Sequence, residues 1–213
     1  MDHRVLDDAL LAEAAMLLAN RDQNFAGILK TYGNPPLWRR PASFSTLIRI
    51  ILEQQVSLKS ADAMYRKLHT AIKPFSPASF IQAGPDYLRS LGVTRQKTAY
   101  LLHLSSALTE GTLDLRKLAR MADADVKAAL TRIKGLGSWS ADVYLLMAMR
   151  RADIWPAGDL ALAVAVKELH GLKSKPTFEQ LERIAEKWRP HRAVAARMLW
   201  QYYLGRRSNG SKQ

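Results

Sequence analysis

The sequence predicts an all-α protein, and three observations carry this prediction. Apolar residues recur at the helical spacing i, i+3, i+4 through most of the chain. No segment shows a convincing alternation of apolar and polar residues that would indicate a β-strand. Glycine, proline and helix-capping residues separate the periodic segments by short connections. The 213 residues are enough for one large domain or two small helical lobes.

In the N-terminal half, helices are predicted over residues 5–18, from 44, from 58 to about 72, around 80, around 87 and over 95–108. Ser43 and Ser57 are suited to cap the two helices that follow them. Gly92 and Thr94 end one helix and start the next. The Pro-rich stretch 34–41 breaks the helical pattern and is a connector.

In the C-terminal half, helices are predicted over residues 125–133, 138–150, 159–171, from about 178, and 190–203 before a frayed tail. Asp123 is suited to cap the first of these, and Pro190 fits the first turn of the last. Thr177 and Gln180 have the spacing of a capping box. We expect three sequence regions: 1–42 with N-terminal helices that pack on the C-terminal lobe, 43–155 as a helical bundle, and 156–213 as a loop with the C-terminal helices.

The composition favours a polyanionic partner. Thirty-two Lys and Arg residues against 19 Asp and Glu give a net charge of +13, and nucleic acid is the commonest polyanion. A basic protein with no nucleic-acid role remains the alternative. The chain has no cysteine, which excludes disulfides, thiolate zinc sites, cysteine nucleophiles and cysteine-bound iron–sulfur clusters. The five histidines are scattered, so we expect no metal site.

The N-terminus and the apolar runs indicate a soluble, intracellular protein. The start MDHRVLDDALL is acidic where a signal peptide would be basic. The longest purely apolar run, residues 160–166, is too short to span a bilayer. We therefore expect a protein of the cytoplasm and nucleoid, or of the nucleus in a eukaryote.

The most informative local pattern is the segment LTRIKGLGSWSAD at residues 130–142. Its two glycines permit a tight turn between two helices and let backbone N–H groups approach a phosphate. The residues expected to contact DNA here are Arg132, Lys134, Gly135, Leu136, Gly137 and Ser138. The pattern thus predicts a helix-hairpin-helix, at about residues 123–150, that holds a DNA backbone without reading bases. An ordinary corner between two helices is the alternative.

Five segments together resemble the helix-hairpin-helix family of DNA glycosylases, in the family's order over about residues 40–205. They are ILEQQVSLKSADAMYRKL, LRSLGVTRQKTAYLLHLSSAL, IKGLGSWSADVYLL, DIWPAGDLAL and WRPHRAVAARMLWQYY. The resemblance implies two helical lobes with an active-site cleft between them. Asp159 matches the family's catalytic aspartate, whereas its position alone would favour a helix cap, and the order of the family segments reverses that preference.

Within the family, the chain most resembles the 3-methyladenine DNA glycosylase II branch. This implies a base-excision repair enzyme that flips an alkylated purine out of the duplex and hydrolyses its N-glycosidic bond. Trp139 stands where strand-nicking members carry a lysine nucleophile, so the resemblance implies a monofunctional enzyme. The β-rich N-terminal domain of longer bacterial members is absent from this sequence, which leaves the lesion range open.

The resemblance implies further site residues, namely Trp139, Trp200, Tyr144, Gln54 and Gln55 on the substrate side, and Thr94 and Arg95 where the family inserts a wedge residue into DNA. The tryptophans would attract an electron-poor base by stacking and cation–π interaction. Each has a structural alternative: core packing for the aromatic residues, and backbone bonding at a helix end for the two glutamines.

The expected partner is double-stranded DNA with damaged bases, bound by a monomer that needs no cofactor. The resemblance also allows a monovalent cation on the hairpin carbonyls. Two alternatives stay open: a non-catalytic DNA-binding protein, and a glycosylase for another lesion such as a deaminated purine or methylated cytosine. A strand-nicking lyase is disfavoured, because Lys134 precedes the hairpin turn.

Overall fold

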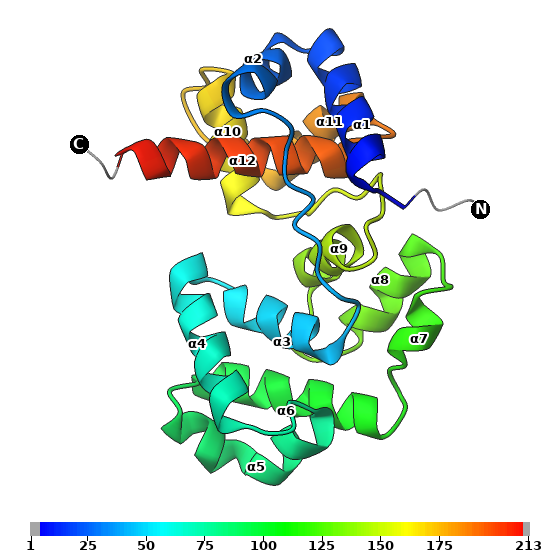
Figure 1. The fold of residues 1–213 in the computed structure, drawn as a ribbon, viewed down its shortest axis with the longest axis vertical. Coiled ribbons are helices and arrows are strands. Elements are labelled where there is room, and N and C mark those ends of the chain that lie inside the picture. The colour runs from blue at the N-terminus through cyan, green and yellow to red at the C-terminus, as the bar shows by residue number, and fades with distance from the viewer. Residues whose placement is uncertain (1–4, 211–213) are drawn as a thin grey trace. The chain divides into compact units, whose positions relative to one another are not determined.

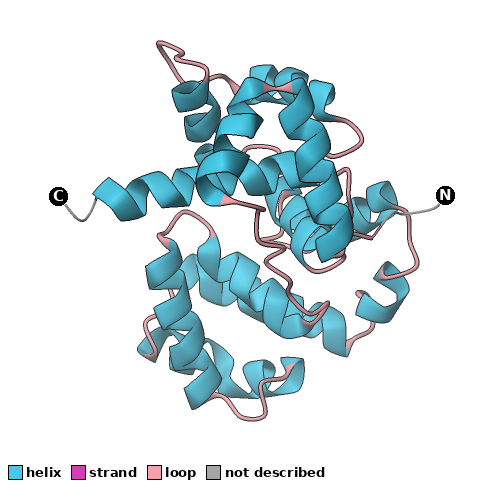
Figure 2. Cartoon of the chain, turned by 45° about the horizontal axis from the view of Figure 1, so that its top comes forward, coloured by secondary structure: helices cyan, strands magenta, loops and turns pink. Residues whose placement is uncertain are grey.

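The computed structural model describes residues 5–210, with side chains through residue 207. Over this part of the chain it contains twelve α-helices, one 3-10 turn and no β-strand, which confirms the all-α prediction (Figures 1 and 2). Val5 and Arg151 form an isolated antiparallel bridge. None of the described helices has the length and apolar character that crossing a membrane requires.

The chain divides into two compact units, and both ends of the chain contribute to the first. Unit 1 comprises Met1–Arg39 and Met149–Gln213, and unit 2 comprises Arg40–Ala148. The elements of unit 1 are α1 (Asp8–Arg21), α2 (Gln23–Tyr32), α10 (Leu160–Leu169), α11 (Phe178–Ala185), the 3-10 turn η1 (Glu186–Trp188) and α12 (Arg192–Gly210). Helices α1, α2 and α10 all pack on α12, the long red helix of Figure 1.

The helices of unit 2 are α3 (Phe44–Glu53), α4 (Leu58–Ala71), α5 (Pro77–Ser90), α6 (Arg95–Thr109), α7 (Leu115–Leu118), α8 (Asp123–Thr131) and α9 (Ser138–Met147). Helix α3 packs on α4, α6 and α9. Its predicted apolar face is buried: Phe44, Leu47, Ile48, Ile51 and Leu52. The two short helices predicted around residues 80 and 87 are the halves of α5, which kinks at Gly84.

Several of the predicted helix caps are present in the structure. Ser43, Ser57 and Thr94 accept hydrogen bonds from backbone N–H groups of α3, α4 and α6. Thr177 and Gln180 form both bonds of the predicted capping box. These bonds satisfy backbone N–H groups of the first helical turn, which have no carbonyl partner within the helix.

Several helices begin at residues other than those predicted. Helix α1 begins three residues later than predicted, because Asp7 caps it by accepting from the N–H of Leu10 at 2.8 Å. Asp123 is the first residue of α8 rather than its cap, and no side chain caps that helix. Pro190 precedes the last helix, which starts at Arg192.

The periodicity also misjudged how far some helices extend. Helix α9 ends at Met147, before Arg150 adopts a left-handed backbone with φ of 56°. Helix α12 continues to Gly210 instead of ending at Tyr203, so residues 208–210 of the predicted frayed tail are helical, and residues 211–213 lie outside the described range. Helices α2 and α7 were not predicted.

Candidate functional site

Unit 2 contains the predicted hairpin, and the turn between α8 and α9 requires glycine at one of its two positions. Gly135 has φ of 95°, and a Cβ placed on it would overlap the ring of Tyr100. Gly137 has φ of −84°, and a Cβ placed on it would meet no atom within 4 Å. Leu136 is 2% exposed and anchors the turn in the core. Leu136 therefore has only its backbone to offer a ligand, and its contact with DNA stays a prediction.

Two side chains from elsewhere in unit 2 hold the hairpin backbone. The Gln54 amide nitrogen donates to the carbonyl oxygen of Gly135 at 2.7 Å and lies 3.0 Å from Ser140 Oγ. The N–H of Lys134 donates to His103 Nδ1 at 3.2 Å. Gln54 thus serves the hairpin itself and is half-buried. The Gly135 carbonyl keeps one lone pair, and cation binding there stays a prediction.

The C-terminal end of α3 is held by Lys97, which the sequence did not single out. Its ammonium group donates to the carbonyl oxygens of Leu52 at 2.7 Å and Gln54 at 2.9 Å. Burial lowers the pKa of Lys97 from its ordinary value. The next residue, Gln55, is exposed and has a left-handed backbone with φ of 56°. Of the two predicted glutamines, Gln55 is the exposed one and Gln54 is half-buried.

The exposed side of the hairpin carries donors and positive charge. Arg132, Lys134 and Ser138 are exposed, and no side chain caps the N-terminus of α9. The first-turn N–H groups and the helix dipole therefore leave a partial positive charge there. Thr94 and Arg95 are also exposed, although the Thr94 hydroxyl accepts from the Lys97 N–H at 3.2 Å as the cap of α6.

An ion pair with a buried carboxylate and a partly exposed ammonium group joins the two helices that flank the hairpin. The ammonium group of Lys127 on α8 lies 2.9 and 3.0 Å from the two carboxylate oxygens of Asp142 on α9. The Asp142 side chain is 4% exposed and that of Lys127 38%. Separation of the two helices would leave the Asp142 carboxylate unpaired in a poorly solvated place, which is unfavourable. The pair therefore holds α8 and α9 together.

The two aromatic candidates on α9 differ in exposure. Trp139 is partly exposed near the start of the helix. Tyr144 is only 1% exposed, and burial raises its pKa to about 12. Tyr144 therefore belongs to the packed interior, which was its structural alternative, and its contact with a base stays a prediction.

Asp159 in unit 1 is the N-cap of α10, and it is 7% exposed. Its Oδ1 accepts a hydrogen bond from the N–H of Leu162 at 2.9 Å. This bond fixes the orientation of the carboxylate at the positive end of a helix. A nearly buried carboxylate acts in a low dielectric, where it stabilises a developing positive charge more strongly than in water. The two interpretations of Asp159 are compatible, because the hydrogen bond that caps the helix also orients the carboxylate that catalysis would need.

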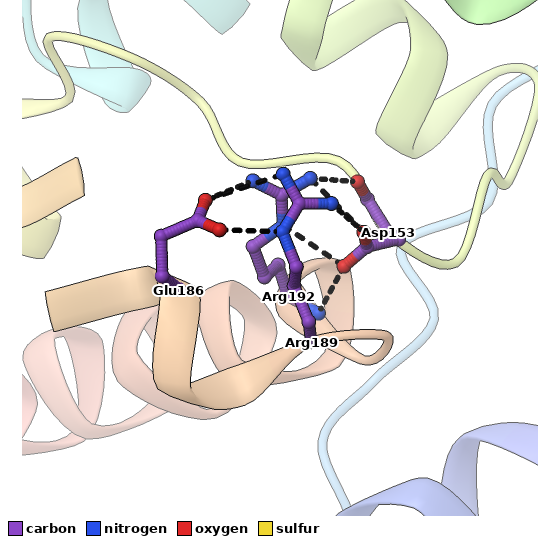
Figure 3. A network of polar contacts seen from close by, with 4 residues as sticks. All are labelled: Asp153, Glu186, Arg189 and Arg192. Carbon is purple, nitrogen blue, oxygen red and sulfur yellow. Dashed lines mark hydrogen bonds and ion pairs between the residues drawn. The ribbon is translucent and has the colours of Figure 1, made fainter. Parts of the chain in front are cut away.

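The loop that leads to Asp159 is tied to α12 by a network of two arginines and two carboxylates (Figure 3). Arg192 donates to Asp153 Oδ1 at 2.9 Å, to Oδ2 at 3.0 Å and to the Asp153 carbonyl oxygen at 2.9 Å. Arg189 lies 2.7 Å from Asp153 Oδ2 and 2.6 Å from Glu186 Oε2. Its hydrogen bond holds the pKa of Glu186 below the ordinary value. The network anchors the loop six residues before Asp159.

The remaining candidate, Trp200, lies on α12 and is 9% exposed. It contacts Trp38, which the sequence did not single out, edge to face at 6.2 Å between ring centroids. The acids that might be mistaken for catalytic partners form ion pairs instead: Glu53 with Arg40 and Arg49, and Asp62 with Arg49 and Arg66.

Known proteins resemble the chain in sequence and in fold. The alkylbase DNA glycosidase-like protein mag2 of Schizosaccharomyces pombe is 26% identical over 86% of this chain and 90% of its own length. The putative DNA-3-methyladenine glycosylase YfjP of Bacillus subtilis is 26% identical over 84% of this chain, which spans 65% of that relative. The S. pombe 3-methyladenine DNA glycosylase Mag1, solved in complex with abasic DNA, superposes with a TM-score of 0.81 at 26% identity, over 89% of this chain and 95% of Mag1.

The family assignment rests on the segment that includes both the hairpin and the Asp159 loop. Residues 48–191 match the sequence profile of the HhH-GPD superfamily of base excision DNA repair proteins. This match covers more than half of the 213 residues. The chain belongs to the HhH-GPD superfamily of base excision DNA repair proteins.

Proposed function

We propose that the protein is a monofunctional DNA glycosylase that excises alkylated purines of the 3-methyladenine type from double-stranded DNA. The observation that carries the proposal is the nearly buried Asp159 carboxylate, oriented at the start of α10 by its bond to Leu162. Membership of a base excision repair family and the names of the relatives support the same reaction. Such an enzyme acts in whichever compartment holds the DNA.

In the proposed reaction, the flipped nucleotide loses its base and the sugar gains a hydroxyl group. The bond between C1′ and the base nitrogen breaks, and its electron pair leaves with the base. A cationic alkylpurine departs as a neutral base, so no acid needs to protonate it. Asp159 stabilises the positive charge that develops on the sugar, and it orients the water that attacks C1′ and accepts a proton from it.

The proposed hold on DNA comes from the hairpin of unit 2. The uncapped N-terminus of α9 offers N–H groups to a phosphate, while Arg132 and Lys134 add formal charge. Exposed Gln55 and Arg95 are proposed to contact the DNA around the extruded nucleotide, and Trp139 to contact the damaged base. Helix α9 contains no lysine, which supports hydrolysis without a Schiff base.

The test is base release from methylated duplex DNA by the native chain and by Asp159→Asn. The amide oxygen of asparagine can still accept the Leu162 bond, so the fold and the affinity for abasic DNA should be retained while release is lost. Release of 3-methyladenine at the native rate by Asp159→Asn would refute the catalytic assignment. Sedimentation of the native chain at its monomer mass of 23.9 kDa would support the proposed monomer.

A second candidate is a DNA-binding protein without catalysis, and the cap bond of Asp159 is the observation that favours it. An aspartate retained only as a cap would be present in an inactive protein as well. Tight binding to abasic DNA with no release of any methylated or deaminated base from the native chain would support this candidate.

A further inference from the structure

Unit 1 contains a cavity of about 620 Å³ beyond the C-terminal end of α10. Its lining comes from the connecting segment 172–176 and from the helix that follows it, α11 with the turn η1. Asp159 caps the other end of α10, and the ten residues of that helix put about 15 Å between its two ends. The cavity is therefore separate from Asp159 and needs an explanation of its own.

Backbone hydrogen bonds fix both ends of the connecting segment. Gly171, with φ of 60°, follows the end of α10, and the N–H of Leu172 donates to the carbonyl oxygen of Lys167 at 3.0 Å. This is the Schellman pattern, in which a left-handed residue turns the chain out of a helix. At the other end, Thr177 and Gln180 form the capping box of α11. The segment is thus a wall held at both ends.

One face of α11 and η1 forms the other wall. Its four lining residues have the spacing i, i+3, i+4, i+7 of a single helical face: Gln180, Arg183, Ile184 and Lys187. The acidic residues of the same stretch follow a different stripe and do not line the cavity: Glu179, Glu182 and Glu186. The positive and negative side chains of this element are thereby separated, with the positive ones at the cavity.

Three basic side chains line the cavity. Lys173, Arg183 and Lys187 are exposed, and among residues 5–207 none of them forms an ion pair with a carboxylate. Arg183 and Lys187 are four residues apart, a spacing at which like charges on a helix repel. The neighbouring Arg189, by contrast, lies 2.6 Å from Glu186 in an ion pair. The cavity therefore gathers positive charge that the fold does not compensate.

The cavity also has an apolar part. Leu172 is 38% exposed, Ile184 is half-buried and Pro176 is buried in the wall. Covering such partly exposed apolar surface with another apolar group is favourable. A DNA backbone presents phosphates but no aliphatic or aromatic side chain for this purpose, whereas an acidic peptide presents both charge and apolar side chains.

The exposure of the lining residues indicates how a ligand would lie. Pockets for small molecules enclose about 70–90% of the ligand surface. Here the three basic side chains and Leu172 are exposed, so a ligand that contacts all of them keeps one side in solvent. A peptide that lies along the surface and inserts one apolar side chain meets this condition.

We propose that the cavity binds an acidic peptide segment of a partner protein, with an apolar side chain inside and carboxylates on Lys173, Arg183 and Lys187. The site goes beyond the proposed glycosylase reaction and does not depend on it. Complementary charge speeds the encounter and selects the partner, and apolar contact lengthens the life of the complex. The partner and the lesion bind to different residues of unit 1.

The experiment measures anisotropy of a short fluorescein-labelled peptide that has a central Leu-Phe pair between runs of Glu and Asp. The native chain should bind it, and Lys173→Glu and Arg183→Glu should each weaken binding about five-fold or more, because repulsion replaces attraction. The matched control is Lys175→Glu, which reverses an exposed lysine of the same segment that does not line the cavity. At an ionic strength of about 0.15 M, where charges are screened beyond about 8 Å, the control should change the affinity less than about two-fold.

A second peptide, with serine in place of the Leu-Phe pair, separates the apolar contact from the charge. It should bind the native chain about five-fold more weakly or worse, and Leu172→Ser should reduce that difference. Equal binding of the two peptides, or equal weakening by Lys173→Glu and Lys175→Glu, would overturn the proposal. If Arg183→Glu unfolds, Arg183→Gln decides by the same criteria.

Undamaged duplex DNA and inorganic phosphate distinguish the other possible occupants. Duplex affinity should fall no more in Lys173→Glu than in Lys175→Glu, and phosphate at matched ionic strength should not displace the peptide. A native chain that fails to bind the peptide would overturn the proposal. Selective loss of duplex affinity in Lys173→Glu and Arg183→Glu would then make the cavity part of a DNA-binding surface. None of these measurements needs turnover, so their outcome is independent of the proposed reaction.

Discussion

Replacement of Gly135 by alanine tests whether the hairpin has the geometry described above. Gly135 has φ of 95°, and its missing side chain is the space that the Tyr100 ring occupies. A left-handed backbone costs an L-residue about 1–2 kcal/mol. Insertion of a methyl group against a packed ring costs about 1–3 kcal/mol more. Gly135→Ala should therefore lower the free energy of unfolding of unit 2 by about 2–5 kcal/mol.

Gly137→Ala is the matched control, because it adds the same methyl group two residues away. Its φ of −84° suits alanine, and nothing lies within 4 Å of the new Cβ. Its stability should stay within about 0.5 kcal/mol of the native chain. Affinity for DNA should nevertheless fall about ten-fold or more, since the methyl group stands where a phosphate would meet the N–H groups of α9.

Urea denaturation followed by tryptophan fluorescence, and anisotropy of a labelled abasic duplex, measure the two effects. With an m value of about 1–3 kcal/mol/M, the midpoint for Gly135→Ala should fall by roughly 0.7 to 5 M. A native midpoint for Gly135→Ala would show that Tyr100 does not fill the glycine site. If Gly137→Ala binds DNA with native affinity, the proposal that a DNA phosphate binds at the start of α9 is wrong.

Three further outcomes are expected. Asp159→Ala should lose about 0.5–2 kcal/mol of stability with its cap to Leu162, whereas Asp159→Asn should not, and equal melting curves for both would refute the cap. Arg132→Gln and Lys134→Gln should each reduce the slope of log Kobs against log salt by about 0.9, and an unchanged slope would place these residues off the phosphates. Burial raises the pKa of Tyr144 to about 12, so the unfolded chain loses that proton first and stability should fall between about pH 10 and 12, by up to about 2–3 kcal/mol. Tyr144→Phe should remove this alkaline loss, which chemical denaturation at several pH values would detect.

Local patterns in the sequence predicted the parts of the fold that depend on neighbouring residues. A serine before a periodic segment caps a helix through a bond to an N–H group two or three residues on, which is why Ser43 and Ser57 were identified. The local patterns did not reveal the boundary between α1 and α2, where one residue both ends a helix and starts the next. Asp22 ends α1 and caps α2, and the periodicity alone did not reveal a second helix there.

The contacts that shape the candidate site join residues far apart in sequence. Gln54 bonds to Gly135, and Arg197 bonds to Leu37. No spacing rule relates such positions, because the fold alone brings them together. Sequence reasoning therefore proposed Gln54 for the substrate side, while the structure assigns its amide to the hairpin.

The division of the chain has a consequence for synthesis on the ribosome. Helices α1 and α2 leave the ribosome first, yet the α12 on which they pack is translated last. At about 5–20 residues per second, the apolar faces of these two helices wait roughly ten seconds or more for their partner, while unit 2 emerges in one uninterrupted stretch. Slow translation should therefore expose Leu11, Leu18, Phe25 and Ile28 to chaperones and to aggregation for longer than any core residue of unit 2.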